Sequence, residues 1–319
     1  MKKILRKVLP WVFAAAIFYF LFRQSPPKEI LSTIWQANIP YFVVLSIAYF
    51  FIIMLLDCVG LQWAFGRYST KVTFSETILM RGATYLLMLI NYNLGQGGMA
   101  FYLKRTHKAP VFKSLGTIFF LTCIDLGLIL TFGMVAVLRE NIVYREISMR
   151  HSLTSVTLVF YFCFVLIALA PRLRFPPFHW LSKKHLLVAF QESRLIDYAR
   201  VIGLRLPVIV IILLANYFLF QSFRSHLPMT DIMAYSPIIA VVGTLPITPS
   251  GIGTTQALAI EFFRKSLSGP LITEGIYSAG QIILASSLLW VFFNFALKAL
   301  FGLFCIHKKS KSLFEETPV

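Results

Sequence analysis

Charged residues are scarce in this chain of 319 residues: Asp, Glu, Lys and Arg make up 13% of it, well below the roughly 25% of an average soluble domain. Hydrophobic residues make up 58% and gather in long runs. No polar stretch is long enough to fold as a separate soluble domain. The composition therefore predicts a single membrane domain over residues 1–319.

Signatures of enzymes and metal sites are also missing. The four cysteines lie inside apolar runs without a CxxC pair, so neither a disulfide framework nor a metal site is indicated. GxSxG, HExxH and Walker A patterns do not occur, and the six histidines fall in loops or at helix ends. We therefore predict no catalytic residues, no metal and no cofactor.

Apolar runs of the length needed to cross a bilayer are what the sequence does contain. They lie at about 9–22, 38–65, 111–138, 153–170, 201–223 and 272–305. The first has the basic start of a signal peptide, but Phe18 to Phe22 occupy the place of a cleavage site, so we expect it to be retained as a helix.

Two further apolar stretches, about 74–103 and 231–263, are interrupted by Gly, Asn or Pro near the middle. We interpret each as a re-entrant hairpin, which enters the membrane and returns to the same side. The predicted fold is an all-α polytopic membrane protein with about six spanning helices and two such hairpins.

The distribution of basic residues tests this topology. With the N-terminus in the cytoplasm, the cytoplasmic segments hold nineteen Lys and Arg residues and the outer segments hold eight. Basic residues concentrate on the cytoplasmic side of membrane proteins. The net charge of +17 is thus explained by topology and anionic lipid headgroups rather than nucleic acid, and both termini are predicted to be cytoplasmic.

In this topology the chain contains an inverted repeat. Residues 38–138 and 201–305 each read helix, broken hairpin, helix, and they enter the membrane from opposite sides. The hairpin tips "LGQGG" (94–98) and "PSGIG" (249–253) are loosely alike. Between the repeats, residues 171–200 mix aromatic and basic side chains, which favours a helix on the cytoplasmic surface; a solvated linker is the alternative.

Irregular backbone is tolerated at membrane depth where it is buried in protein or lines a wet cavity. We therefore predict that the two hairpins build a polar site, since free helix ends and nearby polar side chains attract anions. The alternative is that Pro and Gly only kink spanning helices. The candidate residues are Asn91, Asn93, Gly95, Gln96, Gly97 and Gly98 in the first hairpin, and Pro246, Thr248, Pro249, Ser250, Gly251, Gly253 and Gln256 in the second.

Ionisable residues inside apolar runs are costly and usually functional. Arg81 lies two turns into the first hairpin, and Asp125 lies near the middle of the 111–138 run. We expect Arg81 to meet a phosphate or to pair with a carboxylate, and Asp125 is the best candidate for that partner or for a proton site. A purely structural Arg81–Asp125 ion pair is the alternative. Asp57 and Glu261 are weaker candidates because each could reach an interface. Lys298 could reach the cytoplasmic face with its long side chain.

The second hairpin, "LPITPSGIGTTQALAIEFF", resembles the conserved motif of the flippase-like transmembrane domain of lysylphosphatidylglycerol synthases. The first hairpin, with Asn93 before "GQGG" and then "FYLKR", is similar to an earlier motif of that family. The resemblance implies that the Pro, Gly and Gln residues of the second hairpin shape one half of a lipid-headgroup cavity. Asn93, Gly95, Gly97, Gly98 and Arg105 would shape the other half.

The first motif departs from the family pattern, because Leu94 and Gly97-Gly98 stand where a Pro and a Gly-Glu pair are expected. The missing carboxylate puts a proton or cation role at that hairpin in doubt. The soluble synthase domain is not in this sequence, so we expect no lysyl transfer.

These observations favour a flippase that moves a polar, phosphate-bearing lipid headgroup across a bacterial or archaeal cytoplasmic membrane. The lipid partner would be an anionic phospholipid, an aminoacylated lipid or a polyprenyl-phosphate glycan. The alternatives are a secondary transporter of a small solute or ion, and an intramembrane enzyme or assembly partner acting on a lipid carrier, for which Asp125 is the main candidate.

Overall fold

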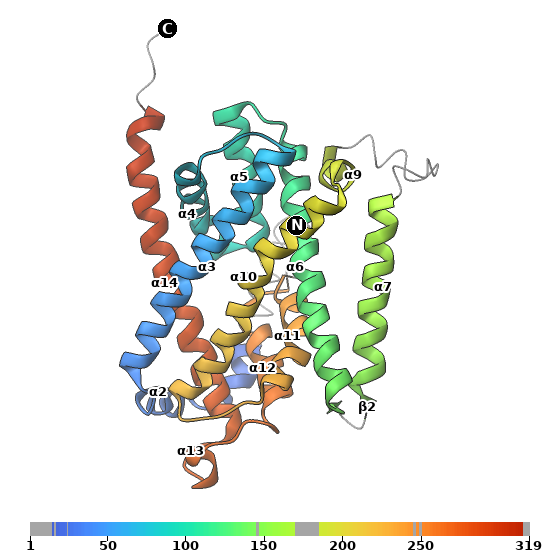
Figure 1. The fold of residues 1–319 in the computed structure, drawn as a ribbon. Coiled ribbons are helices and arrows are strands. Elements are labelled where there is room, and N and C mark those ends of the chain that lie inside the picture. Colours follow the sequence, from blue (N-terminus) through green and yellow to red (C-terminus); the bar gives the residue numbers. More distant parts are fainter. Residues whose placement is uncertain are drawn as a thin grey trace, which may run out of the picture. The chain divides into compact units, whose positions relative to one another are not determined.

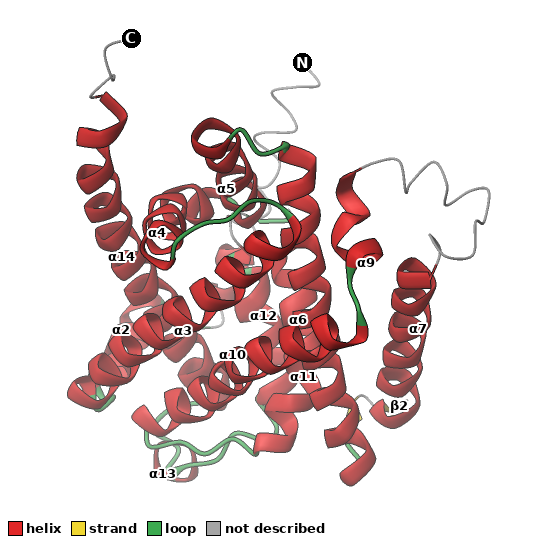
Figure 2. Ribbon diagram, turned by 45° about the horizontal axis from the view of Figure 1, so that its top comes forward, coloured by secondary structure: helices red, strands yellow, loops and turns green. Residues whose placement is uncertain are grey.

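The apolar runs fold as helices, which bond every internal backbone amide within one segment and so tolerate a hydrocarbon surrounding. The computed structural model describes residues 15, 17–23, 25–144, 147–169, 185–244, 247–248 and 251–314. Figure 2 shows that helices make up almost all of this part. Loops and turns connect the helices, and the strands in this part are a short antiparallel pair, β1 (Val143–Tyr144) and β2 (Ile147–Ser148). The predicted all-α fold is confirmed.

Five of the described helices are long and apolar enough to cross a membrane. They are α3 (Ile39–Tyr68), α6 (Val111–Arg139), α7 (Met149–Leu169), α10 (Leu195–Ser222) and α14 (Ala279–Phe314), and all are labelled in Figure 1. Half of the expected first span, 9–22, lies outside the described residues. Two shorter helices are α2 (Pro27–Trp35) and α13 (Pro270–Thr273).

The segment expected on the cytoplasmic surface, 171–200, divides differently in the structure. Residues 170–184 lie outside the described part, and the chain continues as η1 (His185–Leu187) and α9 (Val188–Glu192). The long helix α10 already begins at Leu195, because the Asp197 carboxylate accepts a hydrogen bond from the Arg194 backbone N–H (2.9 Å) and so caps the helix start.

Both interrupted stretches form helical hairpins. The first consists of α4 (Phe74–Ile90) and α5 (Tyr92–His107), and the second of α11 (Met229–Thr244) and α12 (Thr254–Phe263). The chain divides into two compact units, and each hairpin lies within one of them.

The unit that holds the first hairpin comprises Phe51–Thr131, Thr154–Val210 and the chain from Leu297 on. The other comprises the chain up to Phe50, Phe132–Leu153 and Ile211–Ala296. All five long helices begin in one unit and end in the other, whereas each hairpin begins and ends in the same unit. This division agrees with the predicted hairpins, and their re-entry into a membrane stays a prediction.

Candidate functional site

The first hairpin is broken at a single residue, Asn91. Its backbone is extended (φ −159°, ψ 132°), and its side-chain Oδ1 accepts a hydrogen bond from the Asn93 backbone N–H at 2.8 Å. Asn favours such caps because its short side chain can replace a backbone partner. Asn91 therefore ends α4 and starts α5, and the neighbouring Tyr92, Asn93 and Leu94 are exposed.

Two of the candidate glycines let the arms of this hairpin approach each other. A methyl group at Gly95 would lie 2.0 Å from Cγ of Met88, and one at Gly98 would lie 2.6 Å from Cδ1 of Leu87. At Gly97, by contrast, nothing lies within 4 Å of the added carbon. Gly95 and Gly98 thus serve packing, and Gly97 leaves the surface of α5 open.

Polar contacts also join the two ends of the hairpin. The Glu76 carboxylate near the start of α4 accepts a hydrogen bond from the Tyr102 hydroxyl (3.3 Å) and lies 2.8 Å from His107 Nε2, both on α5. Thr73 caps the start of α4 by accepting from the Glu76 backbone N–H. The candidate Arg105 is exposed on this part of α5, at the opposite end from the Asn91 break.

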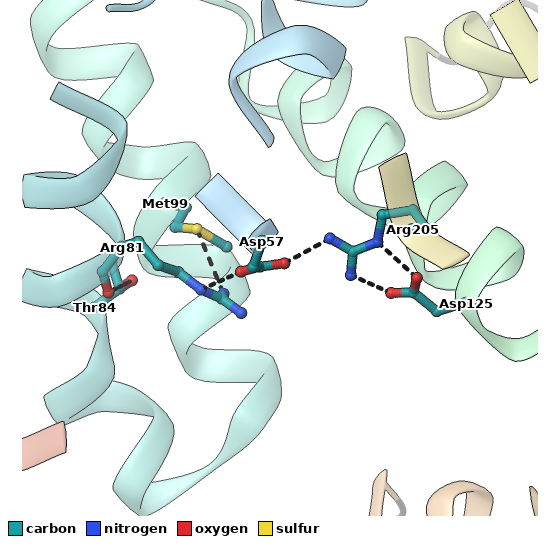
Figure 3. Close-up of polar contacts among 6 residues, drawn as sticks. All are labelled: Asp57, Arg81, Thr84, Met99, Asp125 and Arg205. Carbon is teal, nitrogen blue, oxygen red and sulfur yellow. Dashed lines mark hydrogen bonds and ion pairs between the residues drawn. The ribbon is translucent and has the colours of Figure 1, made fainter. Parts of the chain in front are cut away.

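A chain of four charged side chains lies in the unit of the first hairpin (Figure 3). Arg81 Nε on α4 lies 2.7 Å from Asp57 Oδ2 on α3. Arg205 on α10 donates from Nη1 to the other Asp57 oxygen at 2.7 Å. Its Nε donates to Asp125 Oδ1 on α6 at 2.6 Å, and Nη2 contacts the second Asp125 oxygen. One carboxylate therefore serves two arginines, and one arginine serves two carboxylates.

This charge network is buried most deeply at its centre. The Asp57 and Arg205 side chains are 9% and 7% exposed, whereas that of Asp125 is 26% exposed. Gly60, one turn after Asp57, leaves room for Arg205, because a methyl group there would lie 3.3 Å from its Cδ and Nη1. Paired charges with good geometry are the form in which a membrane interior tolerates ionised groups.

Sequence reasoning selected three of these four residues but paired them wrongly. The alternative of an Arg81–Asp125 ion pair is incorrect, because Arg81 contacts Asp57 and Asp125 contacts Arg205. Asp57, a weaker candidate in the sequence, is buried and pairs with both arginines of the network. Arg205 was missed, although an arginine inside an apolar run was a sufficient signal.

In the second hairpin, the described polar side chains hold the turn itself. Gln256 Oε1 accepts from the Gly253 backbone N–H at 2.6 Å, and the Thr254 and Thr255 hydroxyls donate to the Gly251 carbonyl. The Thr248 hydroxyl lies 2.8 Å from that of Thr254. Thr248 and Gln256 were predicted to line a polar site. In the structure they use part of their hydrogen-bonding capacity within the turn itself.

The glycines of this turn are required by its backbone. Gly251 has φ +73° and Gly253 has φ +92°, backbone angles that residues other than glycine rarely adopt. A methyl group on Gly251 would also lie 3.0 Å from the carbonyl oxygen of Gly243 on α11.

The remaining candidates have different settings. Pro246, Pro249 and Ser250 lie outside the described residues. Gln96 is buried, and its Oε1 has no hydrogen-bond partner in the described part of the chain. Glu261 on α12 accepts from the Tyr144 hydroxyl at 3.0 Å and lies 3.5 Å from Arg264. Since the two hairpins belong to different units, a site shared between them stays a prediction.

An apolar groove of about 390 Å³ lies in the same unit as the charge network. It is lined by spanning helices α6, α7 and α10 and by α9. Its wall includes Ile124, which precedes Asp125, Leu128, which lies about one turn after it, and Ile202, which lies about one turn before Arg205. No group of His, Cys, Asp and Glu side chains with the form of a metal site occurs among the residues that the structure describes.

Interrupted helical hairpins and buried charges in a polytopic helical domain are features of an integral membrane protein that encloses polar groups. Residues 7–302 match the family described as the lysylphosphatidylglycerol synthase TM region. The chain belongs to this family, as the sequence motifs suggested, and it is an integral membrane protein of a family related to lipid headgroups. No curated protein and no solved structure shows a significant match.

Proposed function

We propose that this protein is a flippase, which carries a polar, phosphate-bearing lipid headgroup across the membrane while the acyl chains stay in lipid. Candidate cargoes are an anionic phospholipid, an aminoacylated lipid and a polyprenyl-phosphate glycan. Membership of a family named for lysylphosphatidylglycerol synthesis supports a lipid as the cargo class.

The charge network beside the interrupted first hairpin carries this proposal. Ionised side chains and broken helices are expensive in hydrocarbon and are kept where a polar group must pass or bind. Arg81 belongs to the hairpin itself, while its partner Asp57 and the further members Arg205 and Asp125 belong to three spanning helices. A movement of α4 would therefore separate the Arg81 guanidinium from Asp57 and leave it able to contact another anion within this unit.

A transporter is favoured over an enzyme by the state of Asp125. An intramembrane general base needs an available carboxylate near its substrate. Both oxygens of Asp125 contact the Arg205 guanidinium instead. This favours a role for Asp125 in positioning Arg205.

Headgroup transport in liposomes tests the proposal. Purified protein is reconstituted with fluorescent phospholipids or a polyprenyl-phosphate sugar, with and without a proton gradient. We expect accelerated headgroup movement for at least one of these lipids. Movement should be lost in Gly253→Leu, because residue 253 has φ +92° and a side chain would meet Ile17.

Gly203→Leu is the matched control, because this helical glycine is exposed and has nothing within 4 Å of an added Cβ. It should transport like the unaltered protein. Size-exclusion chromatography establishes that each variant is folded. If well-folded unaltered protein moves none of these lipids, the flippase proposal is overturned in favour of a soluble solute as cargo.

A further inference from the structure

Lys298 is a half-buried basic residue on spanning helix α14. The charge network supplies no counter-ion for it. The network itself is neutral, with Arg81 and Arg205 against Asp57 and Asp125. In the part of the chain that the structure describes, no carboxylate lies within ion-pair distance of Lys298. The five side chains together therefore carry one net positive charge when Lys298 is protonated.

The position of Lys298 around α14 directs it toward α4. Phe301, Gly302 and Cys305 follow it at the spacing of one helix face. A methyl group on Gly82 of α4 would meet Cys305 Sγ and Phe301 Cε1, and one on Gly302 would lie 3.0 Å from the Gly82 carbonyl oxygen. Lys298 therefore lies on the α4-facing side of α14, whereas Leu300, Leu303 and Phe304 are exposed on other sides.

Lys298 shares an aromatic ring with Arg81. Its Nζ lies 6.0 Å from the centroid of the Tyr85 ring, and the Arg81 guanidinium carbon lies 5.6 Å from the same centroid. A ring face attracts cations but leaves their charge uncompensated. Arg81 has Asp57 as its counter-ion, whereas the described residues offer Lys298 the Tyr85 ring and no carboxylate within ion-pair distance.

The contacts also place Lys298 toward the tip of the first hairpin. Along α4 the partner on α14 changes from Cys305 and Gly302 at Gly82 to Phe301 and Lys298 at Tyr85. The two helices thus run antiparallel, and Tyr85 lies one turn nearer than Gly82 to the Asn91 break. Lys298 is half-buried rather than enclosed, so part of the residue lies open at the protein surface.

We propose that Lys298, beside Tyr85 and Arg81, is a binding site for the phosphate of an anionic membrane lipid, in which no headgroup cation neutralises that phosphate. A cation without a counter-ion is costly in an apolar surrounding, and an anionic ligand removes that cost. An ammonium group binds phosphate as a point charge with three donors. This inference rests on the proposed function for its cargo class. It adds that the negative charge of the headgroup is bound by Lys298, which lies outside the four-membered network.

Lipid-dependent thermal stabilisation tests the site without requiring transport. Purified protein in one detergent is titrated with phosphatidylglycerol, with phosphatidylcholine of the same acyl chains, and with inorganic phosphate. Phosphatidylglycerol should stabilise the unaltered protein more than phosphatidylcholine does. In Lys298→Gln its half-saturating concentration should rise about tenfold, the loss of one charge-assisted contact.

Lys298→Arg should retain the preference for phosphatidylglycerol, since the positive charge is kept. Lys308→Gln is the matched control, because Lys308 is exposed on the same helix, and it should bind like the unaltered protein. If Lys298→Gln keeps the full preference, the site is overturned. Stabilisation by inorganic phosphate alone would overturn the lipid assignment. Preferential binding without headgroup transport would support the site while contradicting the flippase.

Discussion

Asp57 is the residue on which the charge network depends, because its two carboxylate oxygens face different arginines on different helices. Arg81 lies at one oxygen and Arg205 at the other, each at 2.7 Å. Removing one member of a buried ion pair leaves an uncompensated charge, and this costs more than the pair contributes. Asp125 has Arg205 as its partner and a side chain that is 26% exposed, so its loss is better tolerated.

We therefore predict that Asp57→Asn destabilises the protein by roughly 3–5 kcal/mol and Asp125→Asn by clearly less. Unfolding of both variants and the unaltered protein in the same mixed micelles measures the difference. Glu274→Gln, at an exposed acid outside the network, is the control and should change little. Equal losses for Asp57→Asn and Asp125→Asn would show that Asp57 is not the shared centre.

The sequence allowed the members of this network to be predicted better than their pairing. A charged residue in an apolar run is visible at once, and Arg81, Asp57 and Asp125 were found in this way. Which carboxylate meets which arginine depends on the rotation of four helices about their axes, and residue spacing within one helix does not determine it. Arg205 could have been selected by the same rule as Arg81.

At the scale of elements, α4 is held between α5 and α14 by small residues on both sides. Gly95 and Gly98 admit side chains of α4, and Gly82 admits Cys305 and Phe301 of α14. Close approach through small residues is a common way for helices to associate in membranes, where lipid removes the hydrophobic drive. Gly97 of α5 does not take part, since nothing lies within 4 Å of an added Cβ there.

We predict that Gly82→Ala destabilises the protein by about 1–3 kcal/mol, because the new Cβ would lie 2.3 Å from Cys305 Sγ and 2.8 Å from Phe301 Cε1. Thermal unfolding in detergent measures this. Gly97→Ala, the matched control in open space, should stabilise by roughly 0.5–1 kcal/mol through helix propensity. The double variant Gly82→Ala/Cys305→Ala should recover part of the loss, and no recovery would contradict the assigned contact.

The existence of both hairpins could be predicted, because Asn, Gly and Pro interrupt long apolar stretches. The role of the polar residues in the hairpin turns could not be predicted. Gln256 is a candidate for the predicted polar site, but in the structure its Oε1 accepts from the Gly253 backbone N–H, and the neighbouring Thr254 and Thr255 hydroxyls donate to the Gly251 carbonyl. A turn at membrane depth must first pair its own amides and carbonyls, and a sequence does not show how many polar groups that takes.

At the scale of the whole molecule, each of the five long helices begins in one unit and ends in the other. Each hairpin lies within a single unit. The basic residues of the sequence predict that the ends of the first hairpin face the cytoplasm and those of the second face the outside. Both ends of a re-entrant hairpin must be accessible from one side, whereas a crossing helix would separate them.

Cysteine labelling in intact cells tests this topology. In a variant without the four native cysteines, a single cysteine is placed at Lys71 or Lys104, flanking the first hairpin, or at His226 or Lys265, flanking the second. An impermeant thiol reagent should label positions 226 and 265 and should leave 71 and 104 unlabelled until the cells are opened. If the two members of either pair label from different sides, that hairpin crosses the membrane.

The sharing of Asp57 between Arg81 and Arg205 also has a consequence for rates. Any displacement of α4 away from α3 must first separate Arg81 from its counter-ion, and this separation adds to the activation barrier. If the added barrier is about 3 kcal/mol, thermal opening slows by roughly a hundredfold. A phosphate that replaces Asp57 at Arg81 during the displacement would remove much of that barrier. We therefore expect the empty protein to open rarely, so that ions and protons leak little while no lipid is bound.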